Sequence, residues 1–361
     1  MICAGGTGGG VYPAMAILQA LGEDANNILW VGGEGGMEAD LVRGAGIPFA
    51  TIPAGQIHGV GLKAIAGLWK ITRGYFEAKR IIQRFKPDVL FFTGGFVSVP
   101  TGLAGRNIPI SICLPDIEPA LALKLVSKFA NLILVPTEES IKYFGSNKKV
   151  IVTGYPTRAE LSNWDREKAF NSFELTSEKK TLLVTGGSKG ARSINQAILK
   201  SLPALLENFQ IIHISGNLTW TEVEEVRNNL TPELAENYRP YPYLHKRMGA
   251  AFTAADLAIT RGGASILGEL PLFSLPAILV PYPYAWKYQF TNANYLASRD
   301  AAIVIKDEDL EQDLLATIQH LMHNEAKLDK MKLAMQNLAK PQAARKIADL
   351  IQQVSTENKA L

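Results

Sequence analysis

The fold is decided by residues 181–195, which read TLLVTGGSKGARSIN. They join a short apolar run to a glycine turn and then to the start of a helical pattern. The same alternation recurs along the chain, and it is typical of parallel strands joined by crossover helices. We therefore predict strands at 28–31, 89–92, 108–113, 132–135, 150–152, 181–185, 211–214, 257–259, 277–280 and 302–305.

The alternation divides the chain into two parts. It stops near Tyr155-Pro156 and a polar stretch, 163–180, and restarts at Thr181. A chain of 361 residues also exceeds what one hydrophobic core usually serves. These observations predict an α/β protein of two Rossmann-like, doubly wound parallel-sheet domains, 1–155 and 156–340, with a hinge around 155–180.

Helical patterns are predicted near both ends of the chain. An apolar helix is expected to begin near Pro13. The closing segment, 314–354, is helical in pattern, and Pro341 should split it into two helices, of which the last, about 341–361, is expected to pack back on the first domain. The first strand is short, because only residues 1–4 precede the glycines, and this suggests a start a few residues upstream.

Composition excludes several classes of protein. The 37 basic and 34 acidic residues give a formal charge of +3, too small for a protein that binds nucleic acid by neutralising phosphates. Cys3 and Cys113 have no spacing typical of a disulfide framework or a zinc site. The sequence contains no leader pattern and no apolar run of 18 residues, so we expect a cytosolic protein that is neither secreted nor membrane-spanning.

Two glycine-rich turns are candidates for phosphate binding. In residues 186–195, bare backbone amides and the Ser188 hydroxyl stand at a helix N-terminus, which suits a diphosphate. The GK[ST] ending of a Walker loop is absent. The turn at 5–10, GGTGGG, is as rich in glycine, but a tight strand-to-helix turn explains it equally well.

Two later motifs suit the sugar parts of a ligand. Residues 261–270, RGGASILGEL, place Glu269 on the first turns of a helix at the carboxyl edge of the sheet, where its carboxylate can accept hydrogen bonds from a ribose diol. A solvated glutamate that stabilises the helix start is the alternative. Gln289 and Asn292 fall on one helical face, and their amides suit sugar hydroxyls.

Taken together and in this order, these motifs resemble the MurG family of glycosyltransferases. The resemblance covers nearly the whole chain and is strongest at 5–9, 94–100, 154–158, 186–195, 261–269 and 281–292. It implies the GT-B fold, in which two Rossmann-like domains face a cleft, with the donor in the C-terminal domain and the acceptor against the N-terminal one. It also implies an inverting transfer of N-acetylglucosamine from UDP-GlcNAc to the lipid-linked undecaprenyl-diphospho-muramoylpentapeptide (lipid I), which yields lipid II for peptidoglycan.

The resemblance also implies roles for residues that would bind UDP. The amides of Gly187 to Ala191 and the Ser188 hydroxyl would hold the diphosphate, and Glu269 would bind the ribose. Backbone around Leu244 and His245 would read the uracil.

Other implied roles concern the sugar and the cleft. Gln289 would bind the GlcNAc hydroxyls, Asn292 would support that loop, and Arg158 would lie near the diphosphates. The complete expected substrate-binding set is Thr7, Gly8, Gly9, Arg158, Gly187, Ser188, Lys189, Gly190, Ala191, Leu244, His245, Ala264, Ser265, Glu269, Gln289 and Asn292.

The chain departs from the family pattern in its acceptor half. Gly10 stands where the family normally has His, and the family's HEQN run appears here as CLPD, residues 113–116. The catalytic base must then come from elsewhere: Asp116 is the first candidate and Glu118 the second, and a turn that caps the next helix is the alternative. We expect no metal or other cofactor, because no DxD-like acidic pair lies near the diphosphate loop.

Three other functions stay open. The altered acceptor-side residues allow a UDP-sugar transferase with a different lipid or small-molecule acceptor. The same architecture serves a UDP-GlcNAc 2-epimerase, which the 5–10 loop and the basic segment described next disfavour. The missing His also allows a protein that binds UDP-GlcNAc but has lost transfer activity.

The segment 60–86 combines positive charge with large apolar side chains. From 56 to 88 the chain has seven basic and two acidic residues, and Trp69 and Phe76 lie among them. A basic amphipathic helix with a Trp suits an anionic membrane surface. We therefore expect a peripheral protein on the cytoplasmic face of the cell membrane, and a helix packed on the sheet with a solvated basic face is the alternative.

Overall fold

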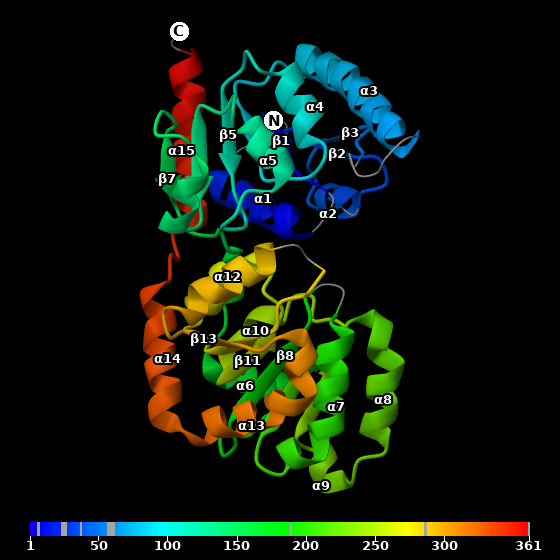
Figure 1. The fold of residues 1–361 in the computed structure, drawn as a ribbon, viewed down its shortest axis with the longest axis vertical. Coiled ribbons are helices and arrows are strands. Elements are labelled where there is room, and N and C mark those ends of the chain that lie inside the picture. The colour runs from blue at the N-terminus through cyan, green and yellow to red at the C-terminus, as the bar shows by residue number, and fades with distance from the viewer. Residues whose placement is uncertain are drawn as a thin grey trace. The chain divides into compact units, whose positions relative to one another are not determined.

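The computed structural model describes residues 1–5, 8–22, 27–36, 38–55, 62–187, 190–284 and 287–359. The chain divides into two compact units, which Figure 1 shows as ribbons. Unit 1 comprises Met1–Arg158 and Pro341–Leu361, and unit 2 comprises Ala159–Lys340. The division after Arg158 falls three residues beyond the expected boundary at 155.

Unit 1 is built on one parallel sheet. Its described strands are β1 (Ile2–Cys3), β2 (Trp30–Gly33), β3 (Phe49–Ile52), β4 (Leu90–Phe92), β5 (Ile110–Cys113), β6 (Leu132–Val135) and β7 (Val150–Val152). Their order is β3-β2-β1-β4-β5-β6-β7, and the pairings are parallel. The order reverses between β1 and β4, and open α/β sheets bind ligands at such a point, outside the carboxyl ends of the strands.

Helices cover both faces of this sheet. The helices α3 (Leu62–Phe85), α4 (Ser98–Ala104) and α5 (Leu121–Val126) pack on one face, and α1 (Gly8–Leu21), α2 (Glu38–Gly44) and α15 (Ala343–Lys359) pack on the other. Alternate strand residues enter the two cores, so Phe92 packs on the α3 side and Phe91 on the α1 side.

The last helix, α15, belongs to unit 1. Its Ile347 and Ile351 are buried with apolar residues of α1, and Arg345 Nη1 donates to Ala20 O at 3.2 Å. Figure 1 draws α15 in red beside the sheet of this unit. The sequence analysis placed the segment 341–361 on the same part of the fold.

Unit 2 has its own parallel sheet. The strands are β8 (Thr181–Thr185), β9 (Gln210–Ile214), β10 (Tyr238–Tyr241), β11 (Leu257–Thr260), β12 (Ala277–Leu279) and β13 (Ala302–Val304), in the order β10-β9-β8-β11-β12-β13. The order reverses between β8 and β11, so the carboxyl ends of these two strands mark the expected ligand position. Two parallel-sheet α/β units of this kind confirm the predicted fold class.

The helices of unit 2 divide into two groups by their packing. The helices α7 (Arg192–Leu206), α8 (Trp220–Asn228), α13 (Leu310–His323) and α14 (Glu325–Asn337) share one core with the sheet. The helix α10 (Met248–Ala254) packs on β8 and against α6 (Arg166–Phe173). Shorter elements are α9 (Pro232–Ala235), α11 (Glu269–Leu272) and α12 (Tyr288–Ala297).

The strands β3 and β10 and the helix α6 departed from the predicted pattern. β3 is half-exposed and β10 contains Pro240, so neither forms the continuous apolar run that identifies a buried parallel strand. α6 lies inside the polar stretch 163–180, which was expected to be a hinge. The Asp165 carboxylate caps this helix, and Phe170 and Phe173 are buried, so this part of the stretch is packed into unit 2. The division of the chain after Arg158 falls within the expected hinge region, 155–180.

Two helix boundaries also differ from the prediction. α1 begins at Gly8 and continues past Pro13. Proline has no backbone N–H, so the helix loses one hydrogen bond, the one to Gly9 O. The closing segment forms three helices instead of two. Asn324 ends α13 and caps α14, because its Oδ1 accepts a hydrogen bond from Lys327 N at 3.0 Å.

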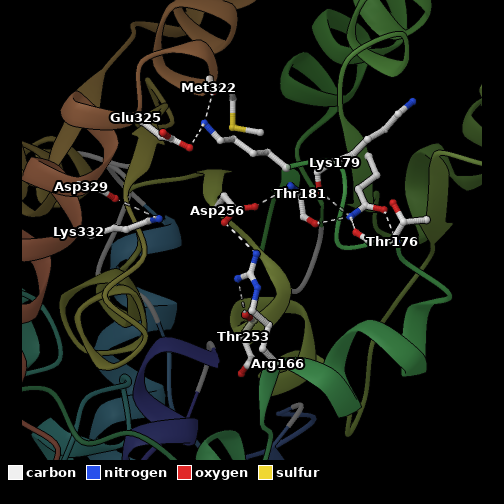
Figure 2. Close-up of polar contacts among 12 residues, drawn as sticks. Arg166, Thr176, Lys179, Thr181, Thr253, Asp256, Met322, Glu325, Asp329 and Lys332 are labelled. Carbon is white, nitrogen blue, oxygen red and sulfur yellow. Dashed lines mark hydrogen bonds and ion pairs between the residues drawn. The ribbon is translucent and has the colours of Figure 1, made fainter.

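A polar network closes the amino edge of the unit 2 sheet (Figure 2). The Asp256 carboxylate is 8% exposed and accepts hydrogen bonds from Thr181 N at 2.8 Å and Arg166 Nη2 at 3.0 Å. Gln210 Nε2 donates to Thr176 O at 2.8 Å and to Thr181 Oγ1 at 2.9 Å. These bonds join the amino ends of β8, β9 and β11, so the glycine turns occupy the opposite edge.

Candidate functional site

The glycine loop after β8 is folded tightly enough to require its glycines. Gly187 and Gly190 have positive φ angles of 78° and 76°. A Cβ at Gly186 would lie 2.1 Å from Ala191 N, and a Cβ at Gly190 would lie 2.1 Å from Ser215 O. The loop therefore packs its own backbone against the end of β9, and α7 begins directly after it. The expected site residues Ser188 and Lys189 lie outside the described residues.

A small cavity brings separate predicted residues together at this edge of unit 2. Its volume is about 70 Å³, and Gly187, Ser265 and Glu269 all line it. Thr185 and Thr260 line it as well, and the sequence analysis missed them. Each ends a strand at the edge where ligands bind, which is the signal that identifies them. The remaining lining residues are Met248, Phe252, Ala258, Ile266 and Leu270.

The cavity is much smaller than the sites that hold whole ligands. Pockets for small molecules usually measure roughly 300–1,000 Å³. The cavity therefore has room for only part of a ligand of that size. Glu269, the first residue of α11, lies at this cavity. Ala264 begins a single turn of 3₁₀ helix, Ala264–Leu267, that places Ser265 at the cavity.

Arg261 connects the loops around this cavity. Its side chain is 11% exposed and forms an ion pair with Asp307, and its Nη2 donates to Ser193 Oγ at 2.8 Å. Ser193 Oγ donates to Asp307 Oδ1 at 2.7 Å, and Arg261 Nη1 also donates to Val280 O at 3.2 Å. The guanidinium lies 5.3 Å from the centre of the Tyr282 ring. One buried cation thus ties the start of α7 to the ends of β11 and β12.

The two amides of α12 also hold these loops. Gln289 Oε1 accepts a hydrogen bond from Tyr282 N at 2.8 Å, and the buried Asn292 donates from Nδ2 to Gly262 O at 3.2 Å. A Cβ at Gly262 would lie 2.3 Å from Gln289 O, so this glycine lets the two segments meet. Since the Gln289 oxygen is engaged, its NH₂ group is the part that can donate to a sugar hydroxyl.

The residues expected to read a base follow β10. Leu244 is buried, and His245 is exposed with its ring 4.6 Å from that of Tyr243. β10 is the edge strand next to β9. Leu244 and His245 therefore lie on the β9 side of β8, and the glycine loop contacts Ser215 on this same side.

In unit 1 the first glycine loop is also closely packed. A Cβ at Gly95, whose φ is 91°, would lie 2.5 Å from Gly5 O, and Thr93 Oγ1 donates to Gly10 O at 2.7 Å. The carboxylate of Glu38 is completely buried, and its Oε1 would lie 2.3 Å from a Cβ at Gly5. This packing explains Gly5 and Gly95 as parts of a tight turn. No sequence pattern indicated that Glu38 would pack against Gly5. Thr7 lies outside the described residues, and Gly8 and Gly9 begin α1.

The remaining acceptor-side candidates lie at the carboxyl edge of the same sheet. The Arg158 guanidinium lies 5.1 Å from the centre of the Tyr12 ring on α1. Asp116 and Glu118 follow β5, the neighbour of β4. Burial, the nearby charge of Glu118 and a hydrogen bond to that carboxylate raise the pKa of Tyr143.

The long helix α3 has two different faces. Ala78 and Ile82 are buried against the sheet, whereas Trp69 is 64% exposed and Phe76 is 57% exposed. On the outward face the aromatic side chains are accompanied by exposed basic residues, namely Lys70, Arg73, Lys79, Arg80 and Arg84. We call this set the basic face of α3. Residues 60 and 61 of the predicted segment and the side chains of 62–66 and 68 lie outside the described part.

The described residues offer neither a metal site nor a membrane-spanning helix. They contain no group of three or more His, Cys, Asp or Glu side chains placed to hold a metal ion. Among the helices described, none has both the length and the apolar character that a membrane-spanning segment needs.

Comparison with known proteins identifies the family. The N-terminal domain model of glycosyltransferase family 28 matches residues 1–135, and the C-terminal domain model matches residues 181–354. A protein of Desulforamulus reducens, named UDP-N-acetylglucosamine--N-acetylmuramyl-(pentapeptide) pyrophosphoryl-undecaprenol N-acetylglucosamine transferase, is 39% identical over 98% of both chains. A protein of the same name from Desulfitobacterium hafniense is 39% identical over 97% of both chains. The crystal structure of Acinetobacter baumannii MurG superposes with a TM-score of 0.75 at 28% identity, covering 98% of this chain and 99% of that one. The chain therefore belongs to the MurG family of glycosyltransferases, within glycosyltransferase family 28.

Proposed function

We propose that this chain transfers N-acetylglucosamine from UDP-N-acetylglucosamine to undecaprenyl-diphospho-muramoylpentapeptide, with inversion at the anomeric carbon. The observation that carries the proposal is the 39% identity over 98% of both chains with a relative named for this reaction. Similarity of this extent includes the acceptor-side unit as well as the donor-side unit.

The donor is proposed to bind at the carboxyl edge of unit 2. The amides of Gly187 to Ala191 and the Ser188 hydroxyl would bind the diphosphate at the N-terminus of α7, a helix of 15 residues. Glu269 and Ser265, which line one cavity with Gly187, would bind the ribose. Leu244 and His245 would contact the uracil, and the NH₂ group of Gln289 would meet the sugar.

The transfer is proposed to need no metal ion. The departing UDP gains negative charge as the glycosidic bond breaks, and backbone amides, a helix dipole and a guanidinium can each stabilise that charge. Arg158 would contribute the guanidinium. Its packing on Tyr12, close to the first glycine loop, fits a residue that acts at this edge of unit 1.

Asp116 is proposed as the general base. The acceptor hydroxyl must lose its proton as it attacks the anomeric carbon, and a carboxylate at the edge of the sheet can take it. Glu118, which follows the same strand, is the second candidate.

The identity of the acceptor is the part of the proposal that most needs a test. The assay combines the purified protein, labelled UDP-GlcNAc and a lipid I analogue in detergent. Formation of a disaccharide product is the expected result. Transfer only to another lipid or small molecule would overturn the acceptor, and binding of UDP-GlcNAc without any turnover would show that transfer has been lost. Release of UDP-ManNAc would identify a 2-epimerase.

The basic face of α3 is proposed to hold the protein on the cytoplasmic surface of an anionic membrane. The support is that Trp69 and Phe76 are exposed on the same helix as the exposed basic residues of this face. Exposed aromatic and basic residues on one helix face suit a membrane interface.

Charge reversal tests this membrane contact. Each basic residue near an anionic surface contributes about 1 kcal/mol, so replacing Lys70, Arg73 and Lys79 by Glu should weaken binding to vesicles with anionic lipid on the order of 100-fold or more. The control reverses three exposed lysines of unit 2 and changes the net charge equally: Lys200, Lys327 and Lys330. Equal release of both variants from the vesicles would refute a specific role for α3.

A further inference from the structure

A chain of buried, hydrogen-bonded side chains adjoins the glycine loop of unit 2. His213, on β9, is completely buried; its Nδ1 lies 2.7 Å from the Tyr238 hydroxyl and its Nε2 lies 3.0 Å from Asn195 Oδ1. Asn195 Nδ2 donates to Ser215 O at 2.8 Å and to Thr219 Oγ1 at 2.6 Å. The chain thus runs from β10 through β9 to the first turn of α7.

The hydrogen-bond partners determine which ring nitrogen of His213 carries the hydrogen. Both N–H bonds of the Asn195 amide are used, so its Oδ1 must accept, and His213 Nε2 must carry the hydrogen that is donated to it. His213 Nδ1 is then a lone pair that accepts from the Tyr238 hydroxyl. Burial lowers the pKa of His213 to about 3 and raises the pKa of Tyr238, so the imidazole is neutral and the phenol keeps its proton.

The carbonyl at the end of this chain supports the loop. Ser215 O accepts a hydrogen bond from the Asn195 amide. A Cβ at Gly190 would lie 2.1 Å from the same oxygen. The backbone of Gly190 therefore lies directly on a carbonyl whose position Asn195 holds. If the Asn195 amide were flipped, its oxygen would face Ser215 O, and two acceptors would oppose each other.

We propose that His213 and Tyr238 are positioning residues for the diphosphate loop, 186–191. The hydrogen on His213 Nε2 holds the Asn195 amide in the one orientation that binds Ser215 O, and Ser215 O in turn sets the backbone of Gly190. The inference rests on the proposed role of this loop in binding the diphosphate. Its consequence is specific: loss of the chain should weaken the binding of phosphate groups and leave the binding of the nucleoside unchanged.

The ratio of the affinities for UDP and uridine measures this effect. Replacing His213 by Leu removes the Nε2 hydrogen, and we expect the ratio to fall about 10-fold while the Kd for uridine stays the same. His213→Gln keeps an N–H donor at a similar distance along the side chain and should largely restore the ratio. The matched control is Gln210→Leu, which removes a buried, hydrogen-bonded amide at the other end of the same strand and should leave the ratio unchanged.

Other outcomes would overturn the inference in distinguishable ways. If UDP and uridine lose affinity in parallel in His213→Leu, the chain serves only the stability of the unit. If the wild-type ratio is already near one, the loop does not bind a diphosphate, and the proposed donor site fails together with this inference.

A second readout does not depend on whether His213→Leu folds. In protein labelled with ¹⁵N-histidine, the His213 ring, assigned among the five histidines by its loss in His213→Gln, should show a protonated Nε2 and a bare Nδ1. Tyr238→Phe removes one hydroxyl only and leaves His213 Nδ1 without its donor; the ring should stay protonated at Nε2, which Asn195 Oδ1 requires, and the UDP to uridine ratio should fall about threefold. A wild-type ring protonated at Nδ1 would overturn the proposed chain of hydrogen bonds.

Discussion

The buried imidazole of His213 should make the stability of unit 2 depend on pH. An unperturbed imidazole has a pKa of 6.5, and burial lowers the pKa of His213 to about 3 in the folded chain. Between these values the unfolded chain binds a proton that the folded chain does not, so the free energy of unfolding falls as the pH falls below about 6.5. Above that pH both states are neutral and the contribution is fully present.

The size of the effect between pH 8 and pH 5 is about 2 kcal/mol. A pH of 5 is about 1.5 units below the pKa of the unfolded imidazole, and each unit corresponds to about 1.4 kcal/mol. The folded imidazole is almost entirely neutral at pH 5, because its pKa lies well below that value. The expected loss therefore depends almost only on the unfolded state.

The assay compares the wild type with His213→Gln at the two pH values. Urea unfolding is followed by pulsed hydrogen exchange of peptides from β8 and β9, so that unit 2 alone is monitored. The wild type should lose about 2 kcal/mol more than the variant between pH 8 and pH 5. His320→Gln, which replaces an exposed histidine of α13, is the control. Equal losses in wild type and His213→Gln, within about 0.5 kcal/mol, would refute the reasoning, because His213 would then titrate alike in both states.

Three further predictions concern the reaction. Asp116→Asn should lower kcat by roughly 10²- to 10⁴-fold with little change in UDP-GlcNAc affinity, since proton removal is needed only in the transition state; full turnover would leave Asp116 as a capping residue and make Glu118→Gln the next variant. Glu269→Ala and Ser188→Ala should each weaken UDP binding by about 1–3 kcal/mol in calorimetry, and unchanged affinity in both would contradict the donor site. EDTA should leave turnover intact, whereas a loss that Mg²⁺ or Mn²⁺ restores would reveal a metal site.

Much of the fold follows from local sequence patterns. The predicted strands 132–135, 150–152 and 181–185 match β6, β7 and β8 to the residue. β6 and β8 are buried throughout, and such strands are continuous apolar runs. The family resemblance likewise rested on motifs that follow such strands, and the relatives that cover the whole chain confirm it. The strands β3 and β10 escaped prediction because neither is an unbroken apolar run: β3 contains Thr51, and β10 contains Arg239 and Pro240.

The candidate site was predictable only in part. The sequence indicated Gly187, Ser265 and Glu269, because glycine turns and carboxylates after parallel strands have a chemical meaning of their own. Thr185 and Thr260 each end a strand at the ligand-binding edge, but many residues share that signal, and only the fold shows that these two line the same cavity.

The sequence by itself determined the two Rossmann-like units, the glycine loops and the family, because these depend on periodicity and on residues close together in the chain. Only the tertiary structure decided which distant side chains meet. Arg261 binds Asp307 and Ser193 across 46 and 68 positions, and His213 joins Asn195 to Tyr238. These contacts depend on strand order and packing, and a buried polar group must find its partner wherever the fold has placed one.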